Sequence, residues 1–195
     1  PHLYIALPTR FQPDRGDATD ILFMASRAGT TRYERLFTEA FIRPGLDPAR
    51  WGNRSNYAAL NVVPTGPEEM SIYHGRSGHR YVLRTDGFVS ARAGSAPGQL
   101  LTRSLTFNGS KLVLNCSTSA AGSLCVEVQE PDGRPLPGFR LEDCVPVIGD
   151  EIERTVNWQN AGDLSALIGK PVRLRFVMVE CDLYSLKFVN ELSSP

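Results

Sequence analysis

The chain has 195 residues, which allows one large domain or two small ones. Hydrophobic residues make up 42% of it, close to the average of globular proteins, so a core can form. Its 21 Lys and Arg balance its 21 Asp and Glu, which argues against nucleic-acid and anionic-membrane partners, and no apolar run approaches the about 18 residues of a membrane span.

The N-terminal half begins inside an apolar alternation, Leu3–Leu7, with no initiator Met before it. A domain rarely begins within a strand, so we expect a piece of a longer protein whose start says nothing about export. Further short candidate strands follow between long polar loops such as Pro13–Asp20 and Gly45–Asn56. These strands are Ile21–Ser26, Ala59–Val63, Met70–Tyr73 and Tyr81–Arg84. The spacing is typical of β-propeller blades, and residues 1–85 suffice for little more than one blade of about four strands.

The turn tripeptide Thr85-Asp86-Gly87 marks the expected boundary between residues 1–85 and a second domain, residues 86–195. The second domain shows short period-2 runs separated by turn residues, Ala121-Gly122 among them, which predicts an all-β, jelly-roll-like antiparallel β-sandwich. Asn108-Gly109 predicts a type I′ hairpin, in which both residues have positive φ. The expected strands are Phe88–Ala93, Leu100–Phe107, Lys111–Cys116, Ser123–Gln129, Phe139–Leu141, Ile152–Trp158, Val172–Met178 and Tyr184–Val189.

The cysteines are Cys116, Cys125, Cys144 and Cys181. Strand alternation places Cys116 on the inward face of its strand and Cys125 on the outward face of the next, so these two cannot form a disulfide. A Cys144–Cys181 disulfide stays open, and free thiols are the favoured interpretation. No Cys-x-x-Cys spacing indicates zinc.

Several segments carry a family resemblance. They are Glu39–Asp47 (Glu-Ala-Phe-Ile-Arg-Pro-Gly-Leu-Asp), Trp51, Val63–Tyr73, Arg84–Ser90, Pro137–Phe139, Asp143–Cys144, Asp163–Ser165, Gly169–Phe176 and Asp182–Ser185. Together they resemble the C-terminal part of bacterial, planctomycete-type glycosyl-hydrolase-like proteins, which are uncharacterised relatives of five-bladed propeller glycosidases. The resemblance covers nearly the whole chain. It implies the end of a propeller followed by a non-catalytic sandwich, in a secreted or periplasmic hydrolase.

The same resemblance bears on catalysis. Glycosidases need two carboxyl groups about 5 to 9.5 Å apart. Most blades that supply them would precede Pro1, so we expect this chain alone to be inactive. Glu39 is the catalytic candidate, because Thr38-Glu39-Ala40-Phe41 is similar to the short Glu-Ala-Pro segment that carries the acid in some propeller glycosidases. Phe41 replaces the proline here.

Three further residues are candidate sugar contacts. Arg43 can hold a sugar hydroxyl or carboxylate as a planar fork, with an ion pair to Glu39 as the alternative. Trp51 lies in a polar loop beside Arg54, so its ring can stack on a sugar and Arg54 can add a polar contact. Trp158 ends an alternating strand, and we expect it in the core.

No cofactor is expected apart from a structural Ca²⁺ at strand-end carboxylates, with solvated loop carboxylates as the alternative. The carboxylates concerned are Asp143, Asp150, Glu151 and Asp182. Three functions stay open. The chain is the non-catalytic C-terminal region of a glycosidase, a stand-alone carbohydrate-binding or adhesion module, or a structural domain that forms homo-oligomers through exposed strand edges.

Overall fold

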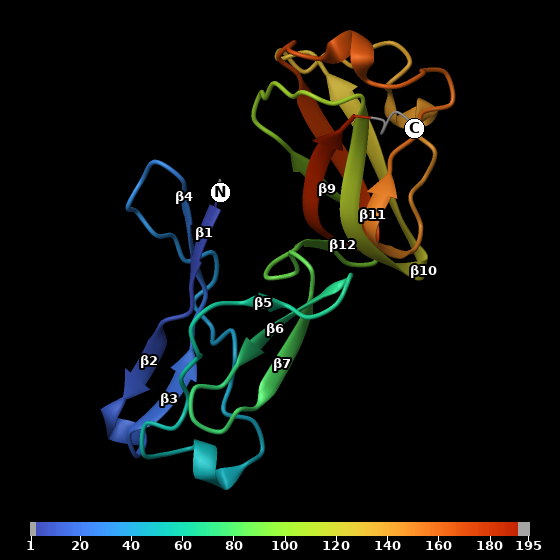
Figure 1. Cartoon of the computed structure of the whole chain (residues 1–195). Helices are drawn as coiled ribbons and strands as arrows, with labels where there is room; N and C mark the ends of the chain where they lie inside the picture. Colours follow the sequence, from blue (N-terminus) through green and yellow to red (C-terminus); the bar gives the residue numbers. More distant parts are fainter. Residues whose placement is uncertain (1–2, 191–195) are drawn as a thin grey trace. The chain divides into compact units, whose positions relative to one another are not determined.

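A computed structural model of the chain describes residues 3–190 (Figure 1). The fold is all-β, with 46% of residues in antiparallel strands. It divides into two compact units, of which unit 1 ends at Leu83 and unit 2 begins at Arg84. No helix in this range is long and apolar enough to cross a membrane. The helices are single 3-10 turns: η1 (Pro13–Arg15), η2 (Pro48–Arg50), η3 (Leu141–Asp143) and η4 (Ser165–Leu167).

Unit 1 consists of three small sheets, with strand orders β1-β4, β2-β3 and β5-β6-β7. Its strands are β1 (Leu3–Ala6), β2 (Thr9–Gln12), β3 (Ala18–Ile21), β4 (Met24–Arg27), β5 (Val63–Pro64), β6 (Glu69–Tyr73) and β7 (Arg80–Arg84), the last of which ends at the boundary. A propeller blade is a sheet of about four strands, and none of these sheets reaches that size. The blade assignment therefore stays a prediction.

The expected polar loop at 13–20 is wrong, because the structure has a β-hairpin there. β2 and β3 pair antiparallel, with Thr9 opposite Ile21 and Gln12 opposite Ala18. The turn consists of η1 followed by two left-handed residues, Gly16 (φ 65°) and Asp17 (φ 59°). Glycine and aspartate tolerate that conformation, so the local sequence suits the turn.

The core of unit 1 is small. Three buried isoleucines, Ile21, Ile42 and Ile72, form its centre. A separate group of rings adds to it, with Phe23 stacked on Phe37 at a centroid distance of 6.2 Å. Burial of so few apolar side chains supplies only a modest driving force for folding.

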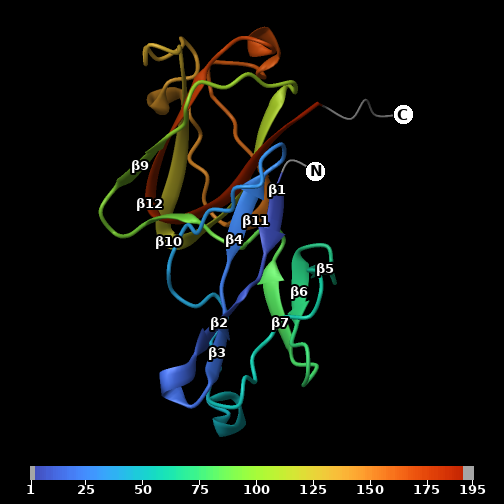
Figure 2. The same cartoon turned by 90° about the vertical axis from the view of Figure 1, so that its left-hand side faces the viewer.

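Unit 2 is built on one five-stranded sheet of order β11-β10-β12-β8, with β9 also paired to β12. Its strands are β8 (Ala91–Ala93), β9 (Gly98–Leu101), β10 (Lys111–Gln129), β11 (Asp150–Thr155) and β12 (Arg173–Val189). The sheet curls into half a barrel, as Figure 2 shows for β10 and β12. A jelly roll requires two packed sheets, and the strands described in this unit pair into one.

The prediction of eight short strands is wrong for the centre of this sheet. β10 runs through both Lys111–Cys116 and Ser123–Gln129, so the turn expected at Ala121-Gly122 does not exist. The register against β12 shifts between Thr118 and Ser123, which is a β-bulge. A Cβ at Gly122 would lie 2.5 Å from the Glu180 carbonyl oxygen. Gly122 is therefore needed because two backbones meet closely, and the paired strands bend there instead of reversing.

The type I′ hairpin predicted at Asn108-Gly109 is also absent. Gly109 has φ 154°, and Asn108 does not have a positive φ. A Cβ at Gly109 would lie 2.8 Å from the Phe188 carbonyl carbon, so this glycine again permits a close backbone approach. Of the strand expected over Leu100–Phe107, only Leu100 and Leu101 belong to a strand, β9.

One continuous hydrophobic core fills unit 2. The central positions of β10 and β12, such as Leu114, Val126 and Phe176, have no exposed surface. Segments outside the sheet complete this core, which makes the unit sandwich-like. Among them, Trp158 is buried as predicted, and its Nε1 donates to the Val126 carbonyl at 2.8 Å. Phe139 meets the Trp158 ring edge-on at 5.3 Å.

The four thiols are free. Cys116 lies in the core and Cys125 is half-buried, in agreement with the predicted alternation. The Cys144 thiol donates to the Val145 carbonyl at 3.5 Å and accepts from the Val126 amide at 3.2 Å, so it lies next to Cys125 rather than bonded to the Cys181 considered from sequence.

Candidate functional site

A hollow of about 650 Å³ opens on unit 1 and contains two of the residues singled out from the sequence, Arg43 and Trp51. Its volume falls in the usual range of small-molecule sites. The β2–β3 hairpin forms one wall and the loop before and after η2 forms the other. The lining residues are Arg10, Gln12, Arg15, Ala18, Thr19, Asp20, Arg43, Pro44, Gly45, Leu46 and Trp51.

The hairpin wall is fixed by an ion pair between facing strands. Arg10 and Asp20 are directly opposite in the β2–β3 register. The Arg10 Nε donates to Asp20 Oδ1 at 3.0 Å, and its Nη2 donates to Oδ2 at 2.5 Å. This hydrogen bonding raises the pKa of Arg10. The two parallel hydrogen bonds hold both groups in one orientation. The negative charge of Asp20 is therefore balanced by Arg10 within the hollow.

The loop wall begins at a bridge to the same hairpin. Ile42 exchanges backbone hydrogen bonds with Ile21, at 3.1 Å from the Ile21 amide and 3.0 Å to its carbonyl. This bridge brings the next residue, Arg43, to the rim of the hollow. The guanidinium of Arg43 is exposed and has no hydrogen-bond or ion-pair partner among residues 3–190, and the same holds for Arg15.

Trp51 is held in place with much of its ring exposed. Asp47 caps η2 by accepting from the Ala49 amide at 3.0 Å, and the Trp51 amide then donates to the Pro48 carbonyl at 3.1 Å. The indole Nε1 donates to the Gly45 carbonyl at 2.8 Å. The side chain remains 57% exposed, so a ring face is available to a ligand without rearrangement.

A buried asparagine joins the two walls behind the hollow. Asn56 is fully buried, and its Nδ2 donates to the Thr19 and Arg50 carbonyls, both at 2.7 Å. Its Oδ1 accepts from the Arg50 Nε at 2.9 Å. Arg50 also contacts the Tyr81 hydroxyl. Because every polar atom of the Asn56 amide has a partner, it sets the spacing of hairpin and loop.

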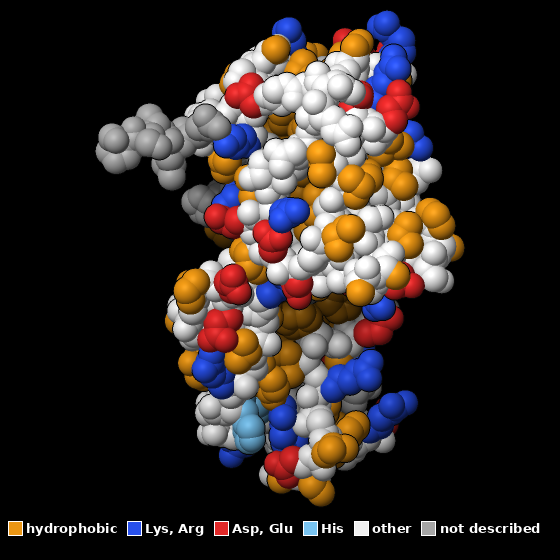
Figure 3. All heavy atoms as spheres, turned by 90° about the vertical axis from the view of Figure 1, so that its right-hand side faces the viewer, with side chains coloured by type: hydrophobic (Ala, Val, Ile, Leu, Met, Phe, Trp, Pro, Cys, Tyr) orange, Lys and Arg blue, Asp and Glu red, His pale blue; other side chains and the backbone are white. Residues whose placement is uncertain are grey.

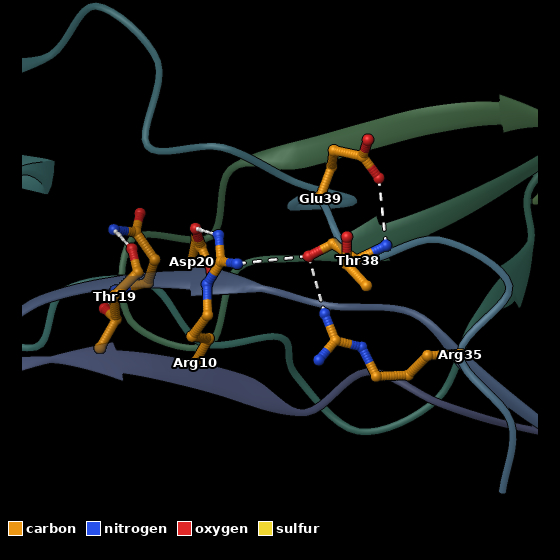
Figure 4. A network of polar contacts seen from close by, with 7 residues as sticks. Arg10, Thr19, Asp20, Arg35, Thr38 and Glu39 are labelled. Carbon is orange, nitrogen blue, oxygen red and sulfur yellow. Dashed lines mark hydrogen bonds and ion pairs between the residues drawn. The ribbon is translucent and has the colours of Figure 1, made fainter.

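Glu39 lies beside this network but does not line the hollow. Its carboxylate accepts from the Thr38 amide at 3.1 Å, while Arg10 and Arg35 donate to the Thr38 carbonyl (Figure 4). Figure 4 shows the Glu39 carboxylate on the other side of Thr38 from the Arg10–Asp20 pair. The alternative ion pair of Glu39 with Arg43 does not occur among the ion pairs of the described residues.

Arg54 is engaged elsewhere. Its Nε lies 3.9 Å from Asp17 Oδ2, and its guanidinium lies 4.8 Å from the centre of the Phe11 ring. It is not one of the residues that line the hollow. The structure therefore brings Arg43 and Trp51 together and separates Glu39 and Arg54 from them.

Sequence reasoning missed Arg10, Arg15 and Asp20. A signal was present, since the aromatic Phe11 stands between Arg10 and Gln12 just before a Pro-containing turn that ends in glycine. The long polar stretch that follows obscured the second strand of the hairpin.

The carboxylates considered for Ca²⁺ have other partners. Asp143 accepts from Asn160, Asp150 pairs with Arg84, Glu151 with Arg154, and Asp182 accepts from Ser90. Across the part of the chain that the structure describes, no three His, Cys, Asp or Glu side chains gather closely enough to hold a metal ion.

Positive and negative side chains are intermingled on the face drawn in Figure 3, consistent with the zero net charge. The hollow differs locally, because three of its lining residues are arginines and Asp20 is its one acidic residue.

No protein family model, curated protein or solved structure matches the chain.

Proposed function

We propose that this chain binds carbohydrate through the hollow of unit 1, as a largely non-catalytic part of a glycoside-hydrolase-like protein. The observation that carries the proposal is the exposed ring of Trp51 in a hollow that also holds the unpartnered guanidinium of Arg43. An aromatic face suits the apolar face of a pyranose, and a guanidinium suits its oxygens.

The charge of the hollow favours saccharides that carry an acidic group. The Arg10–Asp20 pair cancels internally, so Arg15 and Arg43 leave the lining positively charged. A guanidinium can bind a carboxylate or sulfate through two parallel hydrogen bonds, which a lysine cannot do. Uronate-containing or sulfated polysaccharides are therefore the expected ligands.

The arrangement of acids supports a binding role rather than hydrolysis. Hydrolysis requires one carboxyl group that can donate a proton and a second that acts as base or nucleophile. Asp20 is engaged by Arg10 in an ion pair, and Glu39 accepts from the Thr38 amide outside the hollow.

The proposal also covers the origin of the two units and the location of the parent protein. We propose that unit 1 derives from the end of a propeller, that unit 2 is a jelly-roll relative that supports it, and that the parent protein is secreted or periplasmic. The support for these statements is the sequence resemblance at Glu39–Asp47 and Val63–Tyr73. Self-association through strand edges stays a prediction. β1 offers such an edge, because it is paired on one side only, with β4.

The binding test uses the full chain on an array of immobilised neutral, uronate and sulfated polysaccharides. We expect saturable binding to acidic polysaccharides, weakened by about tenfold in Trp51→Ala, which corresponds to about 1.4 kcal/mol. Arg43→Gln should weaken binding to acidic polysaccharides and reduce its salt dependence.

Matched controls separate the hollow from the rest of unit 1. Tyr33→Ala removes another exposed ring and Arg54→Gln another arginine, and neither residue lines the hollow, so both should bind normally. An array without signal for the folded chain would refute the proposal. Release of reducing sugar by the chain would refute its non-catalytic part.

A further inference from the structure

Two cysteines of unit 2, Cys125 and Cys144, lie side by side. Cys125 is on β10, and Cys144 directly follows η3. The Sγ of Cys144 lies 3.2 Å from the amide nitrogen of Val126, the residue that directly follows Cys125, and the two thiols are close enough to shift each other's pKa. The segment after Cys144 lies along β10 through the Leu124–Val147 bridge, with amide-to-carbonyl distances of 3.0 and 2.9 Å. The two sulfurs are thus brought together by backbone pairing, not by chance proximity of two side chains.

The two thiols are not equivalent. Cys144 is 4% exposed, and its Sγ accepts from the Val126 amide at 3.2 Å. Cys125 is half-buried and therefore the more accessible of the two. The interaction with the Cys144 thiol lowers the pKa of Cys125 to about 7, while the same interaction and then burial raise the pKa of Cys144. Cys125 is consequently the sulfur that reacts first, because the thiolate is the nucleophile.

The other two cysteines provide an internal contrast. Cys116 and Cys181 are each 1% exposed, on the adjacent strands β10 and β12. Burial raises the pKa of Cys116, and burial raises the pKa of Cys181 to about 12. Buried protonated thiols of this kind are inert structural residues.

We propose that Cys125 and Cys144 are a reversible dithiol–disulfide pair, oxidised by low-molecular-weight disulfides such as oxidised glutathione. The Cys125 thiolate attacks one sulfur of the small disulfide, which forms a mixed disulfide and releases one small thiolate. Cys144 then gives up its proton and attacks the Cys125 sulfur, which forms the Cys125–Cys144 bond and expels the second small thiolate. Overall the protein loses two electrons and two protons, and the small disulfide becomes two small thiols.

The Cys125–Cys144 disulfide would link the segment around η3 covalently to β10. That segment carries Phe139, which covers the core against Trp158. Closing a loop across residues 126–143 restricts the unfolded chain, so the oxidised protein should unfold at a higher temperature than the reduced protein.

The test exposes the reduced, full-length chain to excess oxidised glutathione and follows it by intact mass and peptide mapping. We expect a loss of about 2 Da and a cross-linked peptide joining Cys125 to Cys144, both reversed by dithiothreitol. The oxidised form should show a raised melting temperature. These measurements need no variant, so they decide the proposal even if a cysteine substitution impairs folding.

Variants assign the two roles. Cys144→Ser should stop at a glutathione adduct on Cys125, and Cys125→Ser should remain largely unmodified. Cys116→Ala is the matched control and should still form the bond. The proposal is overturned by a Cys116–Cys181 cross-link, by a stable adduct on Cys125 in the unmodified sequence, or by a chain that stays fully reduced.

Discussion

Unit 1 and unit 2 are both built of antiparallel strands, but these strands are held together differently in the two units. In unit 2 the long strands β10 and β12 share one sheet, and their inward side chains enter one continuous core. In unit 1 the strands divide among three small sheets around Ile21, Ile42 and Ile72. Polar contacts then carry a larger share of its organisation, and fully buried Asn56 is the clearest case.

This difference explains why the candidate ligand site lies in unit 1. A unit with a small core exposes more of its apolar side chains, and here Leu46, Trp51 and Leu60 are all more than half exposed. The same hydrogen bonds that replace a core, at Asn56 and Arg10, also fix the walls of the hollow. Unit 2 has its thiol pair instead, with half-buried Cys125 packed against a core that contains buried Cys144.

The largest expected effect comes from removing a ring in the core of unit 2. Phe176 has no exposed surface, so Phe176→Ala leaves a cavity and should cost about 3–5 kcal/mol of unfolding free energy. Hydrogen exchange read by mass spectrometry should show lost protection throughout β10 and β12. Val177→Ala, at the half-buried next position, is the control and should cost far less. Equal loss of protection in unit 1 would contradict the independence of the two cores.

Alternation in the sequence was enough to predict which side chains enter the core of unit 2. It placed Cys116 inward, Cys125 outward and Trp158 in the core, and all three agree with the structure. Period-2 patterns succeed here because one face of the sheet is fully buried, which enforces the register.

Glycines were less informative as turn signals, because a glycine can permit either a turn or the close approach of a second backbone. Gly122 and Gly109 were interpreted as hairpin turns, but they permit close approach of Glu180 and Phe188, which lie far away in sequence. Local sequence cannot distinguish these cases, since the deciding atoms belong to β12.

The candidate site was predicted in part. Arg43 and Trp51 share a loop, so sequence proximity indicated their association, whereas their partners Arg10 and Asp20 arrive through a hairpin hidden in a polar stretch. Glu39 was chosen by resemblance. Its carboxylate accepts from the Thr38 amide, a contact that no sequence pattern predicts.

A smaller effect should come from the polar centre of unit 1. Asn56→Ala removes the donor of the Thr19 and Arg50 carbonyls and the acceptor of the Arg50 Nε. Unsatisfied buried groups cost about 1–3 kcal/mol each and partly recover through water, so we expect a loss of about 2–4 kcal/mol in unit 1. Hydrogen exchange around β2 and β3 measures it, with unit 2 unchanged.

Two further substitutions sharpen this experiment. Asn56→Asp keeps an acceptor for the Arg50 Nε but loses the donations to the Thr19 and Arg50 carbonyls. The loss of stability in Asn56→Asp should therefore show how much of the Asn56→Ala effect comes from these two donations. Exposed Asn157 of unit 2 gives the matched control, since Asn157→Ala removes an amide without a burial cost. An Asn56→Ala protein as protected in unit 1 as the parent would mean that its apolar contacts suffice alone.

The smallest expected effect is a pH dependence of stability in unit 1 that unit 2 does not share. All three histidines, His2, His74 and His79, occur before residue 84. His74 is 4% exposed, and its Nδ1 accepts from the Ser77 amide at 3.0 Å. Burial, aided by the nearby charges of Arg50 and His79, lowers the pKa of His74 despite the opposing influence of the Ser55 backbone.

The sign of the pH effect follows from that shift. The folded state disfavours the charged imidazole, so the contribution of His74 to stability is complete above the pKa of the unfolded chain, about 6.5, and is lost as the pH falls from there toward the lowered folded pKa. We expect hydrogen-exchange protection of unit 1, but not of unit 2, to weaken between about pH 7 and pH 5. His74→Gln should remove most of that pH dependence, whereas exposed His79→Gln should retain it. Equal acid sensitivity in both units would mean that carboxylates govern this range, because unit 2 has no histidine to titrate.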